Sequence, residues 1–193
     1  MKKLKVAVTG ANGFVGSRIA DFLRKKGCEV YEIGRHPSSE IKNSKYFIYH
    51  SLGKGIDQDK LKNIDVLVHC AYDFSLTSWE DIKKINVNGS VKLLESAKKA
   101  KLKKIIFIST VSAFEGCTSM YGKAKLTVEK EAKKIAAFIV RPGLVFGKNA
   151  GGMVGSLNKI ISASKFAPLV GSGKQMLYLC HNKDLGETTR GIS

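Results

Sequence analysis

Short runs of apolar residues alternate along this chain with longer segments in which apolar positions recur every three or four residues. The runs predict β-strands at residues 5–9, 29–33, 45–49, 66–69, 104–109, 137–141 and 176–179. The periodic segments predict helices at residues 14–26, 58–63, 79–100, 122–135 and 153–164. Because helical segments separate strands that are apolar on both faces, we expect an α/β fold, a doubly wound parallel sheet of about seven strands.

The first predicted strand breaks into three glycines at three-residue spacing. In such a turn the first glycine permits the tight exit, the second lets the backbone approach a phosphate, and the third lets the helix pack closely. The helix start then offers free amide groups and a partial positive charge to an anion. We expect these residues at a dinucleotide pyrophosphate: Gly10, Asn12, Gly13, Phe14, Val15 and Gly16. The alternative is an ordinary structural turn.

The end of the second predicted strand bears on the choice of cofactor. In dinucleotide-binding folds an acidic residue there holds the ribose 2′-hydroxyl, whereas a basic residue accommodates a 2′-phosphate. This chain has Gly34 at the expected acidic position and Arg35 directly after it, while Glu32 lies two residues earlier. The pattern favours NADP over NAD, although Arg35 could also be a solvent-facing loop residue.

A tyrosine and a lysine four residues apart, Tyr121 and Lys125, share one face of a predicted helix. A free tyrosine, with a pKa near ~10, is a poor acid or base at neutral pH. A neighbouring ammonium, helped by the positive nicotinamide of a bound cofactor, is expected to favour the phenolate and bring that pKa toward a useful range. Upstream, a predicted strand ends in three hydroxyl residues, of which Thr110 is our first candidate for holding a substrate oxygen, Ser112 the second and Ser109 the third.

The composition narrows the possible partners. The net charge of +17 comes from 28 Lys and only 5 Arg, mostly in helical segments without interleaved aromatic residues, so we expect nucleic acid to be an unlikely partner. No apolar run reaches the length that crosses a bilayer, and the basic N-terminus enters the first strand directly, so we expect neither a membrane span nor a signal peptide. The four scattered cysteines predict reduced thiols in a cytoplasmic protein and no metal site.

Taken together, these motifs resemble the extended short-chain dehydrogenase/reductase family, also called NAD-dependent epimerase/dehydratases. The resemblance runs through nearly the whole chain in order. It is carried by Thr9–Gly16, by 65–71, by the Asn-Val-Asn-Gly of 86–89, by the hydroxyl cluster of 109–112, by Tyr121 and Lys125, by the Arg-Pro-Gly of 141–143 and by 169–185.

The resemblance implies roles for individual residues. Tyr121 is then the catalytic acid/base, Lys125 tunes it and binds the nicotinamide ribose, and Thr110 orients the substrate oxygen. Further cofactor contacts are implied for His69, Cys70, Ala71, Pro142 and Gly143, and Asn86 is implied to steady the neighbouring strand and helix. Members are commonly longer than this chain. We therefore expect a Rossmann-like dinucleotide-binding domain at 1–147, and at 148–193 the end of its sheet with the start of a truncated substrate-binding region.

The resemblance predicts an NAD(P)-dependent oxidoreductase or epimerase acting on a carbinol or carbonyl carbon, with a nucleotide-sugar among the candidate substrates. NADP is the expected cofactor and NAD the alternative. Some relatives have instead become non-catalytic dinucleotide-binding sensors or assembly modules, and this remains the competing hypothesis. The sequence leaves open whether the protein is a monomer or a homodimer.

Overall fold

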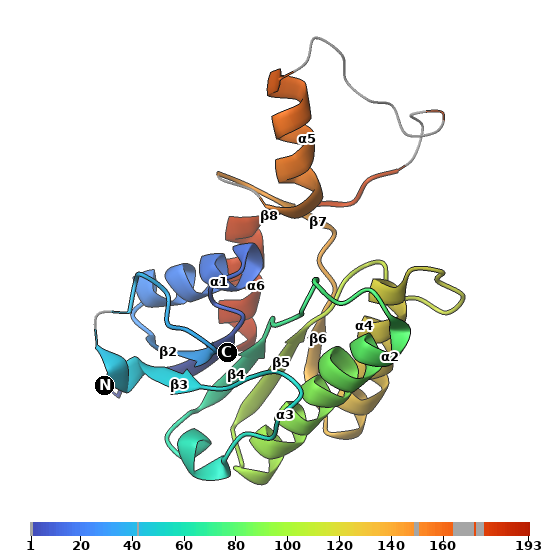
Figure 1. Ribbon diagram of the computed structural model, residues 1–193. Helices are drawn as coiled ribbons and strands as arrows, with labels where there is room; N and C mark the ends of the chain where they lie inside the picture. Colours follow the sequence, from blue (N-terminus) through green and yellow to red (C-terminus); the bar gives the residue numbers. More distant parts are fainter. Residues whose placement is uncertain (1, 42, 149–150, 164–171, 173–175) are drawn as a thin grey trace.

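A computed structural model describes the chain except residues 1, 42, 149–150, 164–171 and 173–175. Its main sheet has six parallel strands in the order β3-β2-β1-β4-β5-β6 (Figure 1). The strands are β1 (Lys5–Thr9), β2 (Glu29–Gly34), β3 (Phe47–Tyr49), β4 (Val66–His69), β5 (Lys104–Ile108) and β6 (Phe138–Val140). The doubly wound parallel sheet predicted from the sequence is confirmed.

Helices cover both faces of this sheet (Figure 1). One face carries α1 (Phe14–Lys25) and α6 (Asn182–Ile192), which pack over a core that includes Val6, Val68 and Ile106. The other face carries α3 (Asn88–Lys99) and α4 (Met120–Lys134), over a core that includes Leu67, Leu93 and Phe107. All these core side chains are at most 1% exposed, so the central strands β1, β4 and β5 are buried on both faces as their unbroken apolar runs predict, whereas the edge strands β3 and β6 are partly exposed.

The predicted helix at residues 79–100 is interrupted. It consists of α2 (Trp79–Asp81), a π-helical segment η3 (Ile82–Val87) and α3. Apolar periodicity did not reveal the π-helical segment, because one widened turn leaves the apolar stripe on nearly the same side. The segment matters because it contains Asn86, which is buried beside the loop after β4.

Two short strands differ from the sequence-based expectation, and the helix predicted at 153–164 lies beside them. β7 (Leu144–Phe146) was not predicted, and β8 lies at Leu179–His181 rather than at 176–179; the two form a separate parallel pair. The helix α5 (Gly152–Ala163) projects away from the main sheet beside them (Figure 1). The last predicted residue of that helix, 164, lies outside the described residues.

The helix α6 was missed, although its apolar spacing was visible. Leu185, Thr189 and Ile192 recur at helical intervals and turn toward α1. His181 caps its start by accepting a hydrogen bond from the Lys183 amide at 3.4 Å. Among short segments, the predicted helix at 58–63 is a 3-10 turn, η2 (Gln58–Leu61), and the start of the predicted strand at 45–49 is η1 (Ser44–Tyr46).

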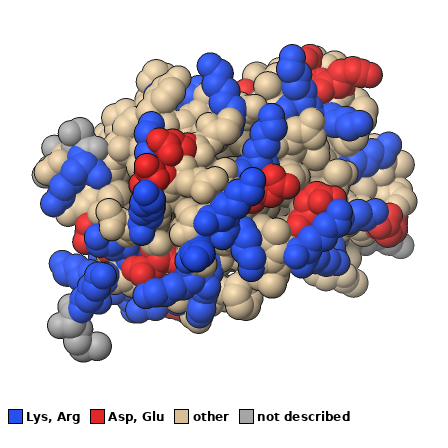
Figure 2. Space-filling model, turned by 90° about the horizontal axis from the view of Figure 1, so that it is seen from below, with Lys and Arg blue, Asp and Glu red and all other residues tan. Residues whose placement is uncertain are grey.

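Basic side chains gather at the end of the molecule where the strands begin. The helices run antiparallel to the strands, so their last turns, which carry Lys25, Lys98, Lys99, Lys133 and Lys134, lie at this end. Figure 2, which views the molecule from below, shows lysine and arginine spread over this face, with acidic groups in several places between them. None of the helices in the described part of the chain is both long and apolar enough to cross a bilayer.

Candidate active site

The glycine turn lies at the carboxyl end of β1, where it leads into α1. Gly10 has φ +68°, a left-handed conformation that L side chains rarely adopt. A Cβ on Gly16 would lie 2.3 Å from the Gly10 carbonyl oxygen, so only glycine lets the helix approach the turn this closely. Gly13 precedes α1 and caps it without a side chain, and the first turn of α1 holds no acidic residue. The turn thus fits an anion such as a pyrophosphate.

Thr9 ties the glycine turn to the end of β4. Its Oγ1 accepts the amide hydrogens of Cys70 at 3.0 Å and Ala71 at 3.1 Å, and it lies 2.7 Å from His69 Nδ1. Because two amides occupy its lone pairs, the hydroxyl donates to His69, whose Nε2 then donates to Ser90 Oγ at 2.8 Å. The backbone after β4 is held directly beside Gly10.

His69 was expected near the cofactor, but its side chain is fully buried and both ring nitrogens are bonded inside the fold. Burial, followed by the charge of Lys125, lowers its pKa to about 3, so the ring is neutral. The sequence placed His69 correctly at the end of β4, but alternation along the strand directs its ring into the core. The groups of 69–71 that lie against the glycine turn belong to the Cys70 and Ala71 backbone.

Asn86 fixes the loop that follows. Its side-chain oxygen accepts the amide hydrogen of Asp73 at 2.7 Å, and its side-chain nitrogen donates to the Asp73 carbonyl at 3.0 Å. Asn86 is 1% exposed, and both polar atoms of its side-chain amide are used in these two hydrogen bonds, which we call the Asn86 clamp. The contact agrees with a steadying role for Asn86 rather than a direct one at the cofactor.

Tyr121 lies at the start of α4 under two aromatic rings that the sequence did not single out. Tyr72 packs edge-on against it at 4.9 Å between ring centroids, and Phe74 lies at 5.4 Å. Ser119 caps the helix, its Oγ accepting the Gly122 amide hydrogen at 3.1 Å. The signal for Tyr72 and Phe74 was their position directly after a strand that ends at the ligand-binding edge.

Lys125 lies below Tyr121 and is 4% exposed. Its Nζ donates to the Ile108 carbonyl at 2.8 Å, and lies 4.7 Å from the Phe107 ring centroid and 5.9 Å from that of Tyr121. Burial lowers the pKa of Lys125 to about 8, partly offset by Cys70 and Glu129. The lysine thus lies between the end of β5 and the tyrosine.

In the protein without cofactor, the pKa of Tyr121 is raised. Burial, followed by the neighbouring Tyr72 and Cys70, raises it to about 12. The Lys125 amino group lies 5.9 Å from the Tyr121 ring centroid and donates its hydrogen bond to the Ile108 carbonyl. In the protein alone, Tyr121 is a protonated phenol at neutral pH.

The three candidate hydroxyls are placed differently. Thr110 is 9% exposed, and its Oγ1 accepts the Ser112 amide hydrogen at 3.2 Å, which leaves its own hydrogen to donate elsewhere. A Cβ on Gly122 would lie 2.4 Å from the Ser112 carbonyl oxygen, so this loop packs against the start of α4, next to Tyr121. Ser109 is 2% exposed, within the strand end. Thr110 therefore stays the first candidate.

The segment after β6 is held from two sides. The Pro142 carbonyl accepts the Val111 amide hydrogen at 3.1 Å, and a Cβ on Gly143 would lie 2.0 Å from the Tyr178 carbonyl oxygen. The neighbouring Arg141 forms two hydrogen bonds with the buried carboxylate of Glu129. Burial alone would raise the pKa of Glu129, but Arg141 outweighs it and the pKa is lowered. Pro142 and Gly143 thus lie at the same edge as Val111.

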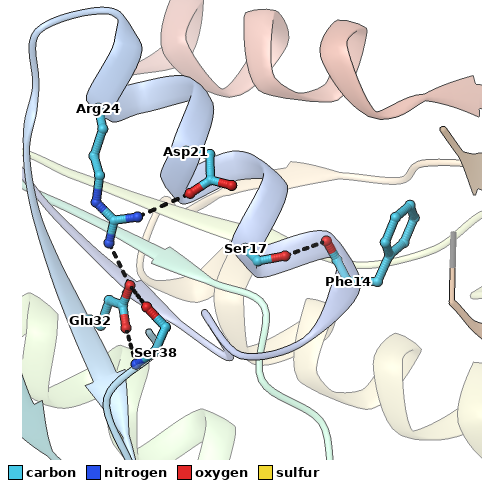
Figure 3. A network of polar contacts seen from close by, with 6 residues as sticks. All are labelled: Phe14, Ser17, Asp21, Arg24, Glu32 and Ser38. Atoms are coloured by element: carbon cyan, nitrogen blue, oxygen red, sulfur yellow. Dashed lines mark hydrogen bonds and ion pairs between the residues drawn. The ribbon is translucent and has the colours of Figure 1, made fainter. Parts of the chain in front are cut away.

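The end of β2 carries a polar network (Figure 3). Glu32 is 2% exposed; its carboxylate accepts hydrogen bonds from Arg24, from the Ser38 amide at 2.9 Å and from Ser38 Oγ at 2.6 Å. Arg24 also pairs with Asp21 at 3.1 Å. A polar cavity of about 260 Å³ lies against this network and reaches the glycine turn at Asn12. The sequence reading missed Arg24 and Ser38, since nothing in their spacing marks them as partners of Glu32.

Arg35 is exposed and follows the network directly. Its charge reaches Asp73, whose pKa is lowered first by its hydrogen bonds with Ser75 and also by Arg35. Across the glycine turn, the Asn12 side chain donates to the His36 carbonyl at 2.8 Å. The structure therefore brings the glycine turn, Arg35 and the loop after β4 to one edge of the sheet.

Residues 6–189 match the sequence profile of the NAD dependent epimerase/dehydratase family. The chain belongs to this family. The resemblance read from the sequence is thereby confirmed, and the chain is an NAD(P)-dependent enzyme of the extended short-chain dehydrogenase/reductase type. Of the family segment at 169–185, residues 169–171 and 173–175 lie outside the described residues.

Individual relatives resemble the chain only distantly. Epimerase family protein YfhF of Bacillus subtilis is 27% identical over 215 residues, covering 97% of this chain and 69% of YfhF. Ceramide reductase of Caulobacter vibrioides is 28% identical over 152 residues, covering 74% of this chain and 46% of the reductase. The solved structure of MoeE5 in complex with UDP-glucuronic acid and NAD has a TM-score of 0.80 at 24% identity, covering 97% of this chain and 71% of MoeE5.

Proposed function

We propose that this member of the epimerase/dehydratase family reduces a carbonyl carbon, or oxidises the corresponding carbinol, with NADP and with Tyr121 as acid/base. The observation that carries the proposal is the meeting of Tyr121, Lys125 and Thr110 at the sheet edge that also holds the glycine turn. Ligands of doubly wound sheets bind at this edge. A relative named epimerase and one named reductase show that the family does not fix the substrate.

A nicotinamide dinucleotide fits the residues present. Gly10, Gly13 and the free amides at the start of α1 would hold its pyrophosphate, and the backbone of Cys70 and Ala71 lies beside them. When bound, the cofactor supplies or accepts the hydride at the substrate carbon. MoeE5 and WbmH, whose solved structures contain NAD, share this fold.

Residues of this chain would supply the proton that the carbonyl oxygen gains. Tyr121 is protonated at neutral pH, the form that donates to a carbonyl oxygen as the carbon becomes a carbinol. Thr110, whose hydroxyl hydrogen is not used by its bond with Ser112, would orient the same oxygen. Lys125, with a pKa of about 8 and its Nζ 5.9 Å from the Tyr121 ring centroid, would supply positive charge near the phenolate that the proton transfer leaves.

The preference for NADP rests on the end of β2. Glu32 is the carboxylate nearest to the expected ribose, but Arg24 and Ser38 occupy its oxygens (Figure 3). A buried carboxylate that is already satisfied gains nothing by accepting from a ribose hydroxyl. The exposed guanidinium of Arg35 is instead free to meet a 2′-phosphate.

The decisive experiment compares wild type with Tyr121→Phe for turnover and for NADPH binding. We expect Tyr121→Phe to lower the rate by about 10²- to 10⁴-fold, the usual contribution of an acid/base group, while the Kd for NADPH stays within about twofold. Tyr49→Phe, at an exposed tyrosine of β3, is the matched control and should leave both unchanged. The panel should span UDP-sugars, alkyl ketones and aryl ketones.

One observation favours a second function, a non-catalytic dinucleotide-binding module. Tyr121 is covered by Tyr72 and Phe74, and the amino group of Lys125 is engaged with the Ile108 carbonyl. If wild type binds NADPH but converts no compound of the panel in either direction, this second function replaces the enzymatic one.

A further inference from the structure

Four exposed, largely apolar side chains lie on segments that meet at the edge of the sheet where Tyr121 lies. Phe74 is 74% exposed, Tyr178 63%, Met120 42% and Val111 41%. Large apolar groups exposed together at a site are uncommon on a solvated surface and mark a place where something apolar binds. We call these four side chains the apolar rim.

Backbone and ring contacts connect the rim from one element to the next. Phe74 follows β4 and contacts the Tyr121 ring, and Met120 is the residue before Tyr121. Val111 follows β5 and donates its amide hydrogen to the Pro142 carbonyl after β6. Tyr178 is joined to the same segment, since its carbonyl accepts the Leu144 amide hydrogen at 2.6 Å. The rim therefore borders the reacting edge rather than a distant surface.

Phe74 is the best placed of the four. Its ring packs against Tyr72 at 4.7 Å and against Tyr121 at 5.4 Å, yet three quarters of the residue faces solvent. An aromatic ring held on one side and open on the other offers a fixed apolar surface directly beside the proton donor. A nucleoside diphosphate favours cationic partners, and the four side chains of the rim carry no charge and a single hydrogen-bond donor, the Tyr178 hydroxyl.

We propose that the apolar rim selects a carbonyl substrate with an alkyl or aryl group next to the reacting carbon, rather than a nucleotide-sugar. This rests on the proposed function, in which the substrate oxygen lies at Tyr121. The apolar group would pack on Phe74 and Met120. In the reduction, the C=O π bond breaks, the carbon gains a hydride from the reduced dinucleotide, and the oxygen gains the Tyr121 proton.

Binding is the primary test, measured by calorimetry and ligand-observed NMR with the whole chain. The probes are 2-decanone, propiophenone and UDP-glucose, each with and without NADPH. We expect both ketones to bind more tightly than UDP-glucose, and Phe74→Ala to weaken them about tenfold through the lost apolar contact. Phe138→Ala, at an exposed phenylalanine on the opposite end of β6, is the matched control and should change nothing.

Phe74→Leu keeps an apolar side chain and should retain most of the ketone affinity. This variant distinguishes the loss of an apolar contact from a loss of folding. Equal or tighter binding of UDP-glucose, or ketone affinities that Phe74→Ala leaves unchanged, would overturn the inference. Self-association of the chain that Phe74→Ala abolishes, without ketone binding, would assign the rim to a second copy and overturn it too. If one of these results is found while wild type still binds NADPH, only the inference about the substrate fails and the proposed function stands. If wild type does not bind NADPH at all, the proposed function itself is refuted.

Discussion

At the scale of single residues, Lys125 is the most unusual group in the molecule. The residue is 4% exposed, and burial lowers the pKa of its amino group to about 8. An unfolded lysine keeps its proton to about pH 10.4. Between about pH 8 and 10.4 the unfolded chain therefore binds more protons than the native one, and the free energy of unfolding contributed by this group rises with pH.

The direction of this pH dependence gives a testable prediction for Lys125. Relative to Lys125→Met, wild type should gain stability as the pH rises from 8 to 10, toward a total of about 3 kcal/mol, the value of a shift of this size. Urea unfolding at pH 7, 8, 9 and 10 measures the difference. Lys123→Met, at an exposed lysine on the same helix, should show no such trend. A pH-independent difference for Lys125→Met would contradict the buried ammonium.

A second residue-scale prediction concerns Arg35. Arg35→Asp should raise the Kd for NADPH about tenfold or more, equal to at least ~1.4 kcal/mol, and should affect NADH far less. Lys92→Asp makes the same change of charge at an exposed position on α3 and serves as the control. Fluorescence titration measures the Kd of each variant for NADPH and for NADH. Equal losses of affinity for the two cofactors would argue against contact between Arg35 and a 2′-phosphate.

At the scale of elements, the π-helical segment places Asn86 against the loop after β4. Asn86→Leu should lower the free energy of unfolding by about 2 kcal/mol, because the Asp73 amide and carbonyl lose buried partners. Asn88→Leu, an exposed position at the start of α3, should be nearly neutral. Chemical denaturation compares the two. Equal effects would show that the clamp contributes little.

The elements also show what the sequence could and could not predict. The glycine turn, the β5 end and the Tyr121 helix were foreseeable, since their spacing is local and the parallel topology brings strand ends together. The clamp of Glu32 by Arg24 and Ser38 was not, because it depends on side-chain reach across α1, β2 and a loop. The rise in the pKa of Tyr121 in the protein without cofactor was not foreseeable, because the sequence gives no measure of burial.

At the scale of the whole molecule, the high net positive charge determines how stability should depend on salt. The chain carries a net charge of +17, much of it on the face where the strands begin (Figure 2). Repulsion among like charges destabilises a compact state, and salt screens it. We expect the Tm to rise by about 2–4 °C between low salt and 0.3 M NaCl, equal to about 1 kcal/mol for a chain of this size.

The control for this salt effect lowers the charge directly. Lys99→Glu and Lys133→Glu, both exposed in last helical turns, should together raise the Tm at low salt and reduce its response to NaCl. Differential scanning calorimetry provides both values. An unchanged response would mean that the basic face is too well solvated for its charges to repel one another.

The π-helical segment at Ile82–Val87 also has a consequence for how this stretch can vary in length. A turn of that kind accommodates one residue more than an α-helical turn. Deleting a single residue there would leave a regular helix whose two ends keep nearly the same orientation, and would remove the widened turn that holds Asn86. A natural relative that lacks one residue in this stretch would therefore anchor the loop after β4 differently. The Tyr72 and Phe74 rings, which belong to that loop and lie over Tyr121, would then be placed differently as well.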